Sequence, residues 1–164
     1  QFTNAAVFQD FDANRKLDEF ANMVVFFGEQ FPSFSVVSHS QGGLVGIHMH
    51  SFYWSKLETA TGGRLLQSVG SPYRGASLAG NLAAIGDVLG VGCGTNAEMT
   101  HDGAALWLST LPASTTPHVN YYTTHYSQSG LIHYCNVAAN AVLSWPDDGT
   151  TENDYNDLPN ATFL

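Results

Sequence analysis

The sequence predicts an α/β fold, in which parallel strands form a sheet with helices on its faces. Short β-branched segments alternate along the chain with longer segments whose apolar residues recur at helical spacing. Hydrophobic residues make up 44% of the 164 positions and charged residues 12%, which is enough apolar material for one core. We therefore expect a single domain over residues 1–164.

Each element is expected from its local pattern. Strands are predicted where Val, Tyr and Thr gather between turn formers, at 34–38, 64–69 and 119–126. Helices are predicted where apolar residues follow the helical period, at 7–30, 44–57, 78–89, 103–111 and 136–143. The tail from 146 to 160 is polar and acidic.

The charge balance excludes two classes of partner. The formal net charge is -9, and the five Lys and Arg residues are mostly scattered. Such a chain repels phosphate backbones and anionic membranes, so we expect no nucleic-acid partner. No apolar run reaches the eighteen or so residues that cross a bilayer, so we expect no transmembrane segment.

Composition also favours a secreted, extracellular protein. Lys is scarce, Ser, Thr, Asn and Gly are abundant, and the balance is acidic. Cys93 and Cys135 fit no zinc spacing. They are either free thiols or one disulfide, which would add about 4 kcal/mol on a chain-entropy basis. We expect no metal site and no cofactor. The first residues show neither a start methionine nor a signal-peptide layout, which predicts a mature or excised chain.

The most informative segment is Val36-Val37-Ser38-His39-Ser40-Gln41-Gly42-Gly43-Leu44, where a strand runs through small residues into a helix. This order predicts a nucleophile elbow with the Ser40 hydroxyl presented above the sheet. Ser38 and Gly42 are the small neighbours that the sharp turn requires, and the Gln41 N–H would stabilise an oxyanion. The alternative is a strand-to-helix connection whose glycines only permit close packing.

At this segment the chain resembles the α/β-hydrolase family, and within it secreted bacterial lipases of the triacylglycerol and lactonising type. Two further segments are similar to those lipases: residues 65–77, with the loop Gly70-Ser71-Pro72-Tyr73-Arg74-Gly75, and residues 100–106 followed by 119–123. The resemblance covers most of 7–152. It implies an ester or lipid substrate hydrolysed through an acyl-Ser40 intermediate, with Asp148, or else Asp147, as the acid.

The resemblance leaves the catalytic base unaccounted for. In those lipases the His follows the acid, whereas every His of this chain precedes Asp148: His39, His48, His50, His101, His118, His125 and His133. The chain is therefore expected to be an internal part of a larger hydrolase, lacking N-terminal strands and nearly inactive alone. Within the chain, His125 is the preferred base, with His118 or His133 as alternatives and Asp87 or Asp102 as acid.

A second function class stays open. In it the chain is a catalytically silent structural or assembly protein, or a processed fragment, that pairs through open sheet edges with missing segments or with other copies.

Overall fold

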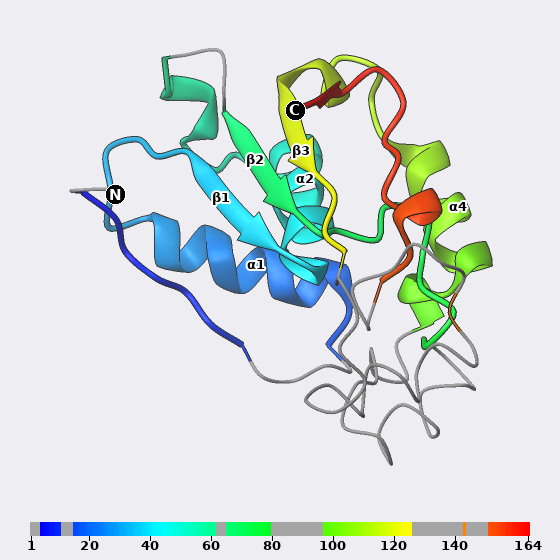
Figure 1. Ribbon diagram of the computed structural model, residues 1–164. Coiled ribbons are helices and arrows are strands. Elements are labelled where there is room, and N and C mark those ends of the chain that lie inside the picture. Colours follow the sequence, from blue (N-terminus) through cyan, green and yellow to red (C-terminus); the bar gives the residue numbers. More distant parts are fainter. Residues whose placement is uncertain (1–3, 11–14, 62–64, 80–96, 126–142, 144–150) are drawn as a thin grey trace, which may run out of the picture.

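The computed structural model describes residues 4–10, 15–61, 65–79, 97–125, 143 and 151–164. Its centre is a parallel four-stranded sheet in the order β1-β2-β3-β4. The strands are β1 (Val36–His39), β2 (Leu66–Val69), β3 (Val119–Tyr122) and β4 (Thr162–Phe163). Figure 1 shows the sheet with α1 and α2 beside it and α4 beyond the β3 side. The predicted fold class is confirmed.

In the described residues, three helices and four short 3-10 turns accompany the strands. The helices are α1 (Leu17–Gly28), α2 (Gln41–Phe52) and α4 (His101–Thr110). The 3-10 turns are η1 (Leu57–Thr59), η3 (Ala97–Met99), η4 (Thr116–His118) and η5 (Asn153–Tyr155). None of the described helices is both long and apolar enough to span a membrane.

The core lies between α2 and the sheet. Helix α2 packs on β1 and β2, and α1 packs on α2. Leu44, Ile47 and Met49 of α2 are fully buried with Leu66 and Val119 of the sheet. Because α2 is apolar on nearly all sides, its burial rather than an amphipathic pattern holds it in place.

Several predicted boundaries differ from the structure. The helix expected over 7–30 begins only at Leu17, where the Glu98 carboxylate accepts the Leu17 N–H at 2.6 Å and the Glu19 carboxylate accepts the Lys16 N–H at 3.4 Å. The helix expected over 44–57 spans Gln41–Phe52, and the strand expected over 119–126 ends at Tyr122. Strand β4 (Thr162–Phe163) lies just after the acidic tail, where the sequence pattern predicts no strand. The helix predicted over 136–143, apart from Leu143, which lies in a bend, and most of that over 78–89 lie outside the described residues.

Candidate functional site

The turn between β1 and α2 has the conformation of an elbow. Ser40 follows β1 directly, and its N–H donates to the Val69 carbonyl at 3.1 Å. Its φ of 54° and ψ of -130° lie outside the usual regions for a residue with a side chain, a strain of about 1–3 kcal/mol. Helix α2 begins at the next residue. The predicted geometry of strand, sharp turn and helix is therefore present.

The glycines of the turn allow a close approach. A Cβ on Gly42 would lie 3.3 Å from the Ser38 Cβ, so these two small residues face each other across the bend. A Cβ on Gly43 would lie 2.1 Å from the Ser71 Oγ and 3.0 Å from the Tyr73 Oη. The start of α2 thus packs directly on the loop after β2, which leaves no room for a side chain at position 43.

The Ser40 hydroxyl is half-buried and forms no hydrogen bond among the described residues. Gln41, the predicted oxyanion donor, is the first residue of α2, where a backbone N–H has no acceptor within the helix. Its side-chain amide donates to the Arg15 carbonyl at 3.3 Å. Ser40 and the Gln41 N–H therefore stand in the order that the elbow hypothesis predicts. No described histidine forms a hydrogen bond with the Ser40 hydroxyl.

The predicted acid and base are not brought to Ser40 in the described part of the chain. Asp148 and its alternative Asp147 lie outside the described residues, as do Asp87, His133, Cys93 and Cys135. His125 is exposed, three residues beyond the end of β3. Its strand ends at the same sheet edge as β1, but no hydrogen bond joins it to Ser40.

A second serine–histidine–carboxylate cluster joins the loop after β2 to the C-terminal segment. The Ser77 hydroxyl lies 2.8 Å from the Glu152 Oε1 and 3.1 Å from the His101 Nε2. The His101 Nδ1 donates to the Arg74 carbonyl at 2.9 Å, and the ring lies 4.1 Å from that of Tyr155. In a triad the carboxylate contacts the imidazole, whereas this fully buried carboxylate contacts the serine. The cluster therefore joins the loop after β2 to α4 and to the C-terminal segment.

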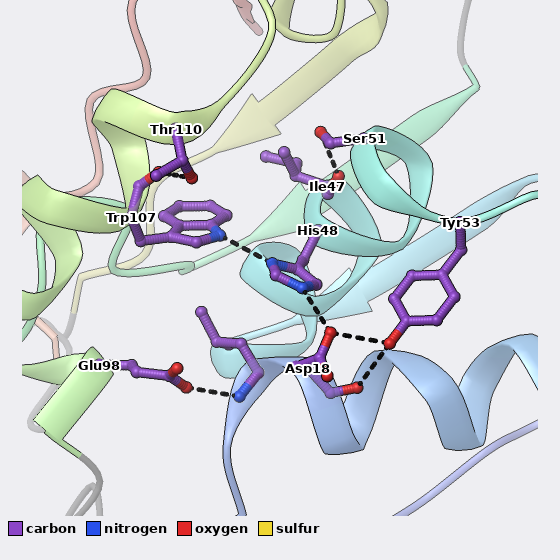
Figure 2. Close-up of polar contacts among 9 residues, drawn as sticks. Asp18, Ile47, His48, Ser51, Tyr53, Glu98, Trp107 and Thr110 are labelled. Atoms are coloured by element: carbon purple, nitrogen blue, oxygen red, sulfur yellow. Dashed lines mark hydrogen bonds and ion pairs between the residues drawn. The ribbon is translucent and has the colours of Figure 1, made fainter.

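A polar network ties α1, α2 and α4 together (Figure 2). The Trp107 indole N–H donates to the His48 Nδ1 at 3.1 Å, so the His48 proton is on Nε2, 3.2 Å from the Asp18 Oδ1. The Tyr53 hydroxyl donates to the same carboxylate oxygen at 2.7 Å. The hydrogen bonds from Tyr53 and then His48 lower the pKa of Asp18, while burial and Asp18 raise that of Tyr53.

Two further histidines face each other at the far end of α2. The rings of His50 and His118 are 5.6 Å apart and nearly perpendicular, and the His50 Nδ1 is buried with no hydrogen-bond partner among the described residues. Burial, and then the charge of His118, lowers the pKa of His50, with a smaller opposing effect of Glu58. The lowered pKa favours the neutral form of the His50 imidazole, which suits packing better than proton transfer.

Sequence reasoning did not predict the clusters around Ser77 and His48. Their members come from separate segments, such as Ser77 and Glu152, which are 75 residues apart. No local spacing marks such a set. The only available signal was that His101, Asp102 and Ser77 fall in segments already noted for their resemblance to hydrolases.

The sheet and the turn at Ser40 define a domain of the α/β-hydrolase type. The mature form of Bacillus licheniformis lipase BlEst2 superimposes with a TM-score of 0.70 and 16% identity, over 92% of this chain and 65% of the lipase chain. At that identity the likeness shows the fold alone.

The chain belongs to the conditioned medium factor C-terminal domain family, whose model matches residues 1–164. Conditioned medium factor of Dictyostelium discoideum is 48% identical over 166 residues, which is 99% of this chain and 24% of that protein. The chain thus spans about a quarter of the length of this curated relative.

These findings correct the prediction of a bacterial lipase. The family assignment and the description of the chain as a hydrolase, lipase or esterase are wrong, because the whole chain matches the conditioned medium factor domain. The reason is that the elbow sequence reflects backbone packing shared by the fold. The catalytic roles of Ser40, Gln41, Asp148 and His125 stay predictions, as do the single domain and the disulfide.

Proposed function

We propose that the chain is one domain, a non-catalytic assembly module of a secreted factor, which uses a hydrolase-type fold to pair with other polypeptide. The observation that carries the proposal is the 48% identity with conditioned medium factor over 99% of the chain. That protein's name describes a factor of conditioned medium, so this domain too would act outside the cell. The composition, acidic and poor in Lys, agrees with such a setting.

The surroundings of the histidines support this proposal. Of the described histidines, His48 accepts the Trp107 N–H, His101 contacts Ser77, and His50 packs on His118. Each of these four is thereby engaged in holding segments of the domain together, whereas His39 and His125 are exposed. An imidazole that acts as a general base must instead lie within hydrogen-bond reach of the nucleophile.

The edge of the sheet at β1 supports the proposed pairing with other polypeptide. Parallel sheets are usually covered on both faces and rarely leave a flat edge in water. Here β1 is the first strand of the sheet order, and Val37 at its centre is 52% exposed. A surface of this kind favours contact with further polypeptide.

The test measures both ester hydrolysis and assembly in the natural, full-length protein. An active-site serine phosphonate is applied to the secreted protein, with a serine lipase as positive control and a Ser40→Ala variant to locate any label. We expect no label at Ser40, no hydrolysis of a short-chain nitrophenyl ester, and loss of the native assembly mass when this domain is deleted. Phosphonate labelling that disappears in Ser40→Ala, or an unchanged assembly mass after deletion, would overturn the proposal.

A further inference from the structure

We infer that Asn160 carries an N-linked oligosaccharide. The inference rests on the proposed function in one respect, which is that the protein passes through the secretory pathway. It follows from an acceptor sequence, from the exposure of the two residues that this sequence requires, and from the turn that presents the asparagine.

The acceptor sequence is Asn160-Ala161-Thr162, which has the form Asn-x-Ser/Thr with a residue other than Pro in the middle. No other asparagine of the 164 residues is followed two positions later by Ser or Thr. Because a three-residue pattern arises often by chance, its place in the fold decides whether it can be modified.

Both residues that the acceptor sequence requires lie on the surface. Asn160 and Thr162 are exposed, and neither side chain forms a hydrogen bond in the described part of the chain. Ala161 between them is partly buried and packs against the core. The fold therefore uses the small middle residue for packing, whereas no described contact requires the amide or the hydroxyl.

The backbone turns sharply at Asn160, just before β4. The Ala161 N–H donates to the Leu158 carbonyl at 3.2 Å, which closes a four-residue turn with Pro159 and Asn160 in the middle. Proline suits the first central position, and the φ of 64° at Asn160 is the left-handed conformation that the second position of a type II turn requires. Asparagine tolerates this conformation better than most residues with a side chain. The exposed amide thus lies on a turn, where a bulky group meets no neighbouring strand.

The turn lies at the opposite end of the sheet from β1. Strand β4 is the last in the described order and pairs with β3 (Figure 1). Phe163 contacts the Tyr121 ring at 5.4 Å but is 60% exposed. An oligosaccharide on Asn160 would lie close to this apolar side chain and to the outer edge of β4, both of which favour unwanted association in water. The exposed Val37 of β1 stays uncovered for the proposed pairing.

The modification is a group transfer in which this domain is the acceptor. The Asn160 amide nitrogen attacks C1 of the N-acetylglucosamine at the reducing end of an oligosaccharide carried on a polyprenyl pyrophosphate. The Nδ2–C1 bond forms, the bond from C1 to the pyrophosphate oxygen breaks, and the lipid pyrophosphate leaves while the amide gives up one proton. The Thr162 hydroxyl belongs to the acceptor sequence that the transferring enzyme recognises.

The experiment maps N-glycans on the natural, full-length protein collected from the medium of eukaryotic cells that express it. Peptide N-glycosidase in heavy-oxygen water converts an occupied asparagine into isotope-labelled aspartate, which mass spectrometry of peptides locates. We expect the label at Asn160 and at no other asparagine of residues 1–164. A secreted protein with an unlabelled Asn160 would overturn this inference alone, whereas retention inside the cells would refute the proposed function with it.

Matched variants separate the modification from folding. Asn160→Asp keeps a residue that tolerates a positive φ, and Thr162→Ala changes only an exposed side chain. Both should lose the mass of one glycan, whereas Thr162→Ser keeps the hydroxyl and should keep the glycan. An unchanged mass in Thr162→Ala would contradict the inference.

A further variant shows whether the cells can glycosylate this domain. Asn4 is exposed but has Ala6 two positions later, so Ala6→Thr completes an acceptor sequence there. We expect labels at both Asn4 and Asn160 in this variant. A label at Asn4 beside an unlabelled Asn160 would show that the exposed turn is not an acceptor and would refute the inference.

Discussion

A methyl group added at Gly43 should destabilise the fold, whereas the same change three residues later should stabilise it. The Gly43→Ala methyl would lie 2.1 Å from the Ser71 Oγ, which is 1.3 Å short of the 3.4 Å at which ordinary contact begins. Rotating the Ser71 hydroxyl away does not help, because its Cβ lies 2.6 Å from the same point. Tyr73 is held by its hydrogen bond to Ser68.

The change in unfolding free energy on Gly43→Ala follows from two opposing effects. Replacing Gly by Ala in a helix gains about 1 kcal/mol, and forcing a methyl into a packed site costs about 3 kcal/mol at the upper end of the usual range. Gly43→Ala should therefore lose about 2 kcal/mol of unfolding free energy. Gly46→Ala meets only ordinary contacts at 3.5 and 3.6 Å. It should keep the gain of about 1 kcal/mol.

Urea unfolding followed by circular dichroism at 222 nm measures both variants. With a slope of about 2 kcal/mol per molar, the midpoint should fall by about 1 M in Gly43→Ala and rise by about 0.5 M in Gly46→Ala. In the double variant Gly43→Ala/Ser71→Gly, part of the loss should be recovered because the colliding side chain is gone. Midpoints that move equally in the two alanine variants would refute the packing of α2 on the loop after β2.

Further variants test three separate features. The pKa of His50 is lowered in the folded chain, so as the pH falls the unfolded chain protonates this imidazole before the folded chain does. The stabilisation that the neutral His50 gives is complete above about pH 6.5, the ordinary pKa of histidine, and is lost as the pH falls through the folded-state pKa. His118→Gln should weaken this pH dependence, measured as the difference between the urea midpoints at pH 7.5 and pH 5. Trp107→Phe should lose about 1–2 kcal/mol with its hydrogen bond, whereas Trp54→Phe, at a side chain 93% exposed, should leave the midpoint unchanged. Ser40→Gly should gain about 1 kcal/mol in the same assay because glycine adopts its positive φ without strain; a loss would show that the Ser40 side chain stabilises the turn.

The parts of the fold that sequence reasoning predicted are those with local causes. The turn at Ser40 depends on nine consecutive residues, 36–44, whose sizes and order decide its backbone path. The start of α1 is harder to predict, because one of the two carboxylates that accept N–H groups there belongs to Glu98, 81 residues away from Leu17. Strand β4 has only two residues and no pattern that distinguishes it from a loop.

The site was harder to predict than the fold, because the partner of a histidine is decided by tertiary contacts. His48 lies in the helix after the elbow, and nothing in its neighbours indicates that it joins α1 to α4 through Asp18 and Trp107. Two described histidines, His48 and His101, have both ring nitrogens within hydrogen-bonding distance of partners other than the Ser40 hydroxyl. A count of serines, histidines and acids in chain order therefore overstates the evidence for catalysis.

The elbow itself shows why a motif typical of catalysis does not by itself establish a reaction. Gly42 and Gly43 are required by contacts with Ser38, Ser71 and Tyr73, whatever residue 40 does. Their presence argues for the fold and adds nothing for chemistry. Only the hydroxyl of Ser40 is free of such a packing demand, since glycine would fit its backbone with less strain. The case for or against a reaction therefore depends on that one oxygen and the groups that reach it, and not on the sequence of the turn.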